Sequence, residues 1–274
     1  MMQSGVLAAD GADLYWEAHG EGPAIVLAHG VGGNHAIWFR QLGPLSRANR
    51  VITFDHRGFG RSTDRDGRGR AAFAEDLHAL LDHLGVERAL LVGQSMGGGT
   101  CIDFACRWPA RVAALAIADS LHAIAEPDDV RPLMDKARAA TRELGQIERV
   151  LGGKARAEDP SLAMLYAQIN SFNATDRHNL AGAFPTYAPE EIGGGRFPIL
   201  FIAGVDDVLF PIEAIRRVQV RVPGSFMVEV SDAGHSAFLE RPVEFNDTLL
   251  TLAQMAGHAG RVAAHSNAAG YTAA

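Results

Sequence analysis

The sequence predicts an α/β fold, in which a doubly wound, mostly parallel sheet carries a helical cap insertion. Short apolar runs alternate along the chain with longer segments whose apolar residues recur at helical spacing. Most of the short runs lack polar alternation, which is typical of strands buried on both faces of a parallel sheet. The alternation is interrupted once, over residues 121–196, where helical patterns occur without a strand pattern.

Turn and breaker residues delimit the expected elements. Asp10-Gly11 separates two apolar runs and predicts an antiparallel hairpin at the N-terminus, and Gly85 ends a periodic helical segment. The predicted strands are residues 6–9, 14–18, 24–28, 51–54, 89–92, 112–118, 199–203 and 226–230. The predicted helices are residues 35–45, 71–84, 96–107, 211–222 and 242–255, with 130–144 and 162–172 inside the interruption.

These elements predict three parts of the chain. Residues 1–120 and 197–256 should form the sheet-and-helix core, and residues 121–196 should lie as a cap over the carboxyl ends of the strands. Residues 257–274 are rich in alanine and glycine without periodicity, so we expect a poorly ordered tail.

Composition narrows the class of protein. The chain has 274 residues, of which 47% are hydrophobic and 21% charged, and a net charge of −7 without a basic stripe, which argues against a nucleic-acid partner. No signal peptide is visible and no apolar run could cross a bilayer, so we expect a cytoplasmic protein without a membrane partner. The two cysteines, Cys101 and Cys106, fit a reducing compartment. Zinc-ligand spacing is missing, and we expect no metal or cofactor.

The most informative motif is Gly-x-Ser-x-Gly at residues 93–97, which directly follows an apolar strand. A strand that enters a helix through this pattern makes a sharp turn with Ser95 at its apex, and the glycines avoid clashes there. A serine hydroxyl is a weak nucleophile by itself, so a base, an orienting acid and an oxyanion hole are needed.

His235 is the expected base and Asp207 the expected acid. His235 lies in a loop after the last strand, where it can reach a serine at the same sheet edge. Asp207 ends a Gly-x-x-Asp loop after the preceding strand, and we prefer it to its neighbour Asp206. Asp119, at the end of strand 112–118, is the rival acid.

Two backbone amides are expected to form the oxyanion hole. The Met96 amide follows the nucleophile at a helix N-terminus, and the Val31 amide lies in the glycine-rich loop at residues 29–33. That loop lacks the Gly-Lys-Ser/Thr of a phosphate-binding loop. We interpret His29 as structural, and likewise Asp55 and Arg57, which should pin a glycine-bent loop beside the serine turn.

Taken together, these motifs resemble the α/β-hydrolase superfamily over about residues 5–256. The resemblance includes its capped, single-domain branch of carboxylesterases, enol-lactonases and ring-cleavage-product hydrolases. Ser95 excludes the branches that use an aspartate nucleophile, and Ser236 stands where ring-cleavage hydrolases often have tryptophan. The motifs that carry the resemblance are HGVG at 29–32, DHRGFGRS at 55–62, GQSMG at 93–97 and GH at 234–235, with the Asp207 loop between the last two.

The resulting prediction is a serine hydrolase that cleaves a small, mainly apolar carboxylic ester through an acyl-enzyme. A lactone or C–C bond hydrolase and a non-catalytic ligand receptor are the alternatives. The apolar pocket is predicted from cap residues, several of which must also pack the cap. Those residues are Met134, Leu162, Met164, Leu165, Tyr166, Phe172, Phe184 and Tyr187.

Overall fold

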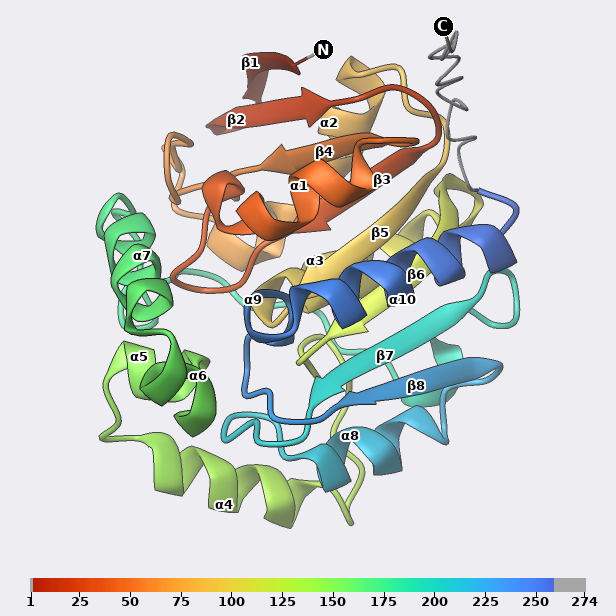
Figure 1. Cartoon of the computed structure of the whole chain (residues 1–274). Coiled ribbons are helices and arrows are strands. Elements are labelled where there is room, and N and C mark those ends of the chain that lie inside the picture. Colours follow the sequence, from red (N-terminus) through yellow and green to blue (C-terminus); the bar gives the residue numbers. More distant parts are fainter. Residues whose placement is uncertain (1, 259–274) are drawn as a thin grey trace, which may run out of the picture.

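Eight strands form one sheet in the computed structural model, which describes residues 2–258 (Figure 1). Their order is β1-β2-β4-β3-β5-β6-β7-β8. The first two strands pair antiparallel, β2 is antiparallel to β4, and every later neighbour is parallel. The strands are β1 (Met2–Ala9), β2 (Ala12–His19), β3 (Ala24–Ala28), β4 (Arg50–Phe54), β5 (Ala89–Gln94), β6 (Val112–Ala118), β7 (Ile199–Gly204) and β8 (Ser225–Val230).

Burial explains why the strand predictions succeed at the centre of the sheet. Every residue of β3, β5, β6 and β7 is buried, as their continuous apolar character predicts. The hairpin turn lies at Asp10-Gly11, where Gly11 has a φ of +69°. Both hairpin strands are longer than predicted, because backbone pairing continues to Met2 and His19 beyond the apolar runs.

Helices cover both faces of the sheet. Helices α1, α9 and α10 pack together on one face, whereas α2, α3 and α8 pack against the other (Figure 1). The α-helices are α1 (Phe39–Leu45), α2 (Phe73–His83), α3 (Met96–Arg107), α4 (Arg131–Thr141), α5 (Gln146–Val150), α6 (Gly153–Glu158), α7 (Pro160–Ser171), α8 (Ile212–Gln219), α9 (Ala237–Glu240) and α10 (Pro242–Met255). The short 3₁₀ helices are η1 (His35–Trp38), η2 (Gly69–Ala72), η3 (Pro109–Arg111) and η4 (Pro189–Glu191).

Helix boundaries differ from the predictions mainly at short segments. The predicted helices 35–45 and 71–84 each begin with a 3₁₀ turn, and α8 is shorter than predicted. Helices α5, α6 and α9 were not predicted, because a helix of one or two turns shows too few apolar residues for a period.

The interval between β6 and β7 contains α4 to α7 and η4, with one isolated bridge between Ile124 and Tyr187. Its helices lie beside the loops that follow the parallel strands (Figure 1). For example, Tyr166 Oη of α7 donates to the Val31 carbonyl, 3.2 Å away in the loop after β3. Of the predicted tail, residues 259–274 lie outside the described residues, while His258 Nε2 donates to the Ala24 carbonyl at 2.8 Å.

Candidate active site

Ser95 occupies a strained turn between β5 and α3. Its φ of 50° and ψ of −118° are unusual for a residue other than glycine, and its amide donates to the Ala118 carbonyl at 2.9 Å. A Cβ at Gly93 would stand 2.2 Å from the Gly97 carbonyl oxygen, and a Cβ at Gly97 would stand 2.0 Å from that of Ala28. Close backbone packing therefore requires the motif glycines. The backbone of Ser95 is itself strained, and strain of about 1–3 kcal/mol at a residue other than glycine is typical of functional sites.

His235 and Asp207 meet beside this turn. Asp207 Oδ2 accepts from His235 Nδ1 at 2.9 Å, and Asp207 Oδ1 accepts from the amides of Leu209 and Phe210 at 2.7 and 3.1 Å. Burial opposes protonation of His235, but the charge and hydrogen bond of Asp207, together with the charge of Asp119, outweigh it and raise the pKa of His235. Because an ionised carboxylate only accepts, His235 carries its proton on Nδ1 and presents a basic Nε2.

The two competing aspartates differ from Asp207 in their surroundings. Asp206 is exposed. Asp119 is fully buried, and its oxygens accept from the backbone amides of Gly204 and Ala237 at 2.8 and 3.3 Å. Burial and the neighbouring Asp207 raise the pKa of Asp119 to about 8. Asp119 thus ties together the loops that carry Asp207 and His235, without a hydrogen bond to the imidazole.

The candidate oxyanion amides come from the two segments that the sequence indicated. Met96 is the first residue of α3, where amides have no acceptor within their own helix. The Val31 carbonyl accepts from Tyr166 Oη at 3.2 Å and from Gln146 Nε2 at 3.3 Å. These two hydrogen bonds hold the loop after β3 in place. Val31, Ser95 and His235 line one cavity of about 340 Å³.

Sequence reasoning missed two residues that hold the His235 loop. Gln94 Nε2 donates to the His235 carbonyl at 2.8 Å. The buried Glu240 accepts from the amides of Gly234, Ser236 and Gly152 at 3.0, 3.3 and 3.1 Å. Gln94 lies within the Gly-x-Ser-x-Gly motif, so its position was a usable signal, whereas nothing near Glu240 in the sequence indicates its partners.

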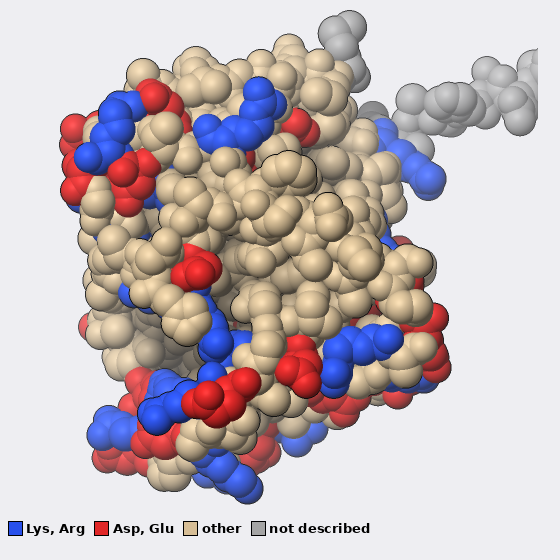
Figure 2. Space-filling view, turned by 90° about the vertical axis from the view of Figure 1, so that its left-hand side faces the viewer, with Lys and Arg blue, Asp and Glu red and all other residues tan. Residues whose placement is uncertain are grey.

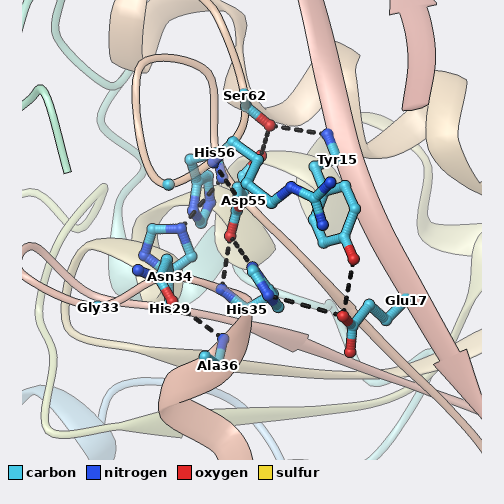
Figure 3. Close-up of polar contacts among 12 residues, drawn as sticks. Tyr15, Glu17, His29, Gly33, Asn34, His35, Ala36, Asp55, His56 and Ser62 are labelled. Atoms are coloured by element: carbon cyan, nitrogen blue, oxygen red, sulfur yellow. Dashed lines mark hydrogen bonds and ion pairs between the residues drawn. The ribbon is translucent and has the colours of Figure 1, made fainter. Parts of the chain in front are cut away.

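His29 and Asp55 hold loops, as the sequence analysis interprets them (Figure 3). The His29 ring donates from Nδ1 to the Gly30 carbonyl at 2.9 Å and accepts at Nε2 from the His56 amide at 3.0 Å. Burial lowers the pKa of His29 to about 4, in keeping with this neutral form. Asp55 accepts from the amides of His35 and Arg61, at 2.6 and 2.8 Å.

Arg57 anchors the same glycine-bent loop to α2. Its guanidinium makes a bidentate contact with Asp76, with distances of 2.7 Å from Nε and 2.6 Å from Nη2. It also donates to Asp66 at 2.9 Å and to the Asp10 carbonyl at 2.9 Å. These hydrogen bonds give Arg57 a structural role.

The cavity is formed mostly by other residues than those predicted, and both apolar and charged side chains line it. Of the cap residues expected there, Met134 alone lines the described cavity. Leu162 and Tyr166 instead pack into the core, and Met164 and Phe172 are 63% and 72% exposed. The apolar faces of the helices between β6 and β7 are used for packing, so polar residues also reach the cavity. The lining includes Val31, Leu121, Leu180, Leu209 and Phe210, but also Arg70, Arg138, Arg149, Arg177 and Glu126.

Residues 2–258 contain no group of three or more histidine, cysteine, aspartate or glutamate side chains placed to hold a metal ion. No helix in that range is both long and apolar enough to span a bilayer.

Known proteins match this architecture closely. A family model described as "alpha/beta hydrolase fold" matches residues 23–159. Over 272 residues the chain is 30% identical to "Putative carbamate hydrolase RutD" of Caulobacter sp. (strain K31), covering 91% of this chain and 97% of that protein.

Two solved structures of enzymes superpose on this fold. Est816, described as an N-acyl homoserine lactone degrading enzyme, superposes with a TM-score of 0.77 at 28% identity, covering 89% of this chain and 98% of that one. The enol-lactonase from Burkholderia xenovorans LB400 superposes with a TM-score of 0.75 at 25% identity, covering 91% and 100%. The chain therefore belongs to the α/β-hydrolase fold family and is a hydrolase.

Proposed function

We propose that the chain is a serine hydrolase that cleaves carboxylic esters with Ser95 as nucleophile, His235 as base and Asp207 as the orienting acid. The observation that carries the proposal is the 2.9 Å contact between Asp207 and His235 beside the strained Ser95 turn, with Ser95 and His235 lining one cavity. The hydrolase names of the relatives make the non-catalytic receptor alternative unnecessary.

The mechanism follows from the protonation state of His235. Its Nε2 takes the Ser95 proton as Oγ attacks the ester carbonyl, and the amides of Val31 and Met96 stabilise the oxyanion. His235 then protonates the leaving alcohol, which leaves Ser95 acylated. Water attacks the acyl-enzyme with His235 again as base, releases the acid and restores the serine. Residues 121–196 act as a cap over this site, on a core formed by residues 1–120 and 197–256.

Lactones are the second candidate substrates. Two of the similar structures are described as lactone-degrading enzymes, and the same three residues can open a lactone, whose leaving alkoxide stays attached to the acyl group. Carbamates should be tested beside esters and lactones, because one relative is named as a putative carbamate hydrolase. No described contact favours the C–C bond alternative, which stays a prediction.

The proposal is tested with Ser95→Ala and p-nitrophenyl butyrate. The substitution should lower kcat/KM by at least about 10³-fold, because the nucleophile is removed while the cavity remains. Ser161→Ala, at an exposed serine of α7, is the matched control and should behave as the unaltered protein. Labelling by a fluorophosphonate should disappear only in Ser95→Ala. Turnover by Ser95→Ala close to that of the control would refute the proposal. Rates measured in parallel on esters, lactones and carbamates would show which of these substrate classes the protein prefers.

A further inference from the structure

Three arginines line the candidate active-site cavity without an acidic partner among the residues that the structure describes. Arg70 comes from η2, Arg149 from α5 and Arg177 from the segment after α7. Within residues 2–258, none of the three forms an ion pair with an aspartate or glutamate. A fourth lining arginine, Arg138, differs because Glu126 and Asp135 neutralise it. The cavity thus holds three guanidinium groups that no carboxylate of the described part of the chain pairs with.

Backbone carbonyls hold two of these guanidinium groups in place. Arg149 Nη1 donates to the Thr141 carbonyl at 2.6 Å, and Arg70 Nε donates to the Gly182 carbonyl at 2.9 Å. A guanidinium has five N–H donors, so these bonds orient each group and leave further donors for a ligand. The side of the molecule in Figure 2 has a depression in which Lys or Arg atoms are visible.

The surroundings make this charge costly. Both Arg70 and Arg149 are partly buried, and burial lowers the pKa of each. Repulsion from Arg177 adds to the effect at Arg149. Fully buried cations are almost always paired, and a partly buried guanidinium has part of the same desolvation cost, which an anionic partner would offset. The charge of Arg149 is also felt by the imidazole of His235, so it acts within the proposed reaction centre.

We propose that the missing partner is the substrate: an ester or lactone that carries a carboxylate, which Arg149 binds together with Arg177 and Arg70 while Ser95 faces the scissile carbonyl. This inference rests on the proposed function and specifies its substrate class. A charge-assisted contact to a guanidinium is stronger than a neutral hydrogen bond and can be bidentate, which fixes the orientation of the substrate.

The test compares two p-nitrophenyl esters of equal length, the hexanoate and the mono-adipate, which differ in a terminal carboxylate. The unaltered protein should turn over the adipate monoester with a kcat/KM about 10-fold or more above that of the hexanoate. Arg149→Met should reduce this ratio at least about 10-fold, and Arg149→Lys should retain part of it. Arg156→Met, at an exposed arginine of α6 outside the cavity, should leave the ratio unchanged.

The outcomes separate the two proposals. A kcat/KM for the adipate monoester at or below that of the hexanoate in the unaltered protein would overturn the anionic substrate class, and this result needs no variant to fold. An unchanged ratio in Arg149→Met, with Ser95→Ala inactive on both esters, would overturn the role of Arg149 but keep the serine mechanism. Turnover of either ester by Ser95→Ala would instead contradict the proposed function.

Discussion

At the scale of single residues, the assignment of the orienting acid depends on which carboxylate faces the imidazole. Asp207 accepts from His235 Nδ1, whereas Asp119 accepts only from backbone amides. Asp207→Asn would place an NH₂ donor opposite Nδ1, favour the wrong tautomer and lower kcat by about 10⁴-fold. Asp119→Asn should cause a far smaller loss of kcat. Steady-state rates of both variants on p-nitrophenyl butyrate check this, and the reverse order would identify Asp119 as the acid.

The pH dependence of kcat/KM should report the ionisation of His235. The base must be neutral to take the serine proton, so activity falls as pH decreases through its pKa. Because Asp207 raises that pKa, half-maximal kcat/KM on the low-pH side should lie above 6.5. The charge of Arg149 acts in the opposite direction, so Arg149→Met should move this midpoint to higher pH. A midpoint below 6.5 in the unaltered protein would contradict the protonation scheme.

At the scale of elements, the packing of α3 against the end of β3 depends on a motif glycine. Gly97→Ala would place a Cβ 2.0 Å from the Ala28 carbonyl oxygen and 2.9 Å from that of His29. We expect the free energy of unfolding to fall by about 1–3 kcal/mol or more, since backbone atoms must move. Gly153→Ala, at an exposed glycine of α6 where the added Cβ would lie 3.9 Å from Arg156 Nη2, should instead raise it by up to about 1 kcal/mol. Urea denaturation compares the two, and equal stabilities would contradict the packing argument.

The sequence predicted those elements whose pattern is local and long enough to be visible. The central strands are continuously apolar, and the motif loops lie at their carboxyl ends, so both the positions of these strands in the chain and the placement of Asp207 and His235 at one edge were predictable. Helix α9 has four residues and no visible period. The presence of arginines in the cavity could not be predicted. Arg70 and Arg177 are far apart in the chain, and only the packing of the segment between β6 and β7 brings both to one cavity.

At the scale of the whole molecule, the proposed cap shares its apolar packing with the core. Leu151 and Leu162 belong to the cluster of core residues on the α1 and α10 face, and Met134 and Ile192 belong to the cluster on the opposite face. Hydrogen bonds also cross between the two parts, for example from the Gly152 amide to Glu240 Oε2 at 3.1 Å. An insertion that buries its apolar residues in this way has no separate core of its own.

Cap and core should therefore unfold in one cooperative transition. Tryptophan fluorescence reports on the core, because residues 121–196 contain no tryptophan, and pulse proteolysis with mass spectrometry reports cleavage inside the cap. The two measurements should give the same urea midpoint in the unaltered protein. Glu240→Gln should lower both midpoints together, because it weakens a carboxylate held by amides on both sides of the boundary. Cleavage of the cap at urea concentrations where the fluorescence of the unaltered protein is still native would show that the cap opens independently, and would contradict the shared core.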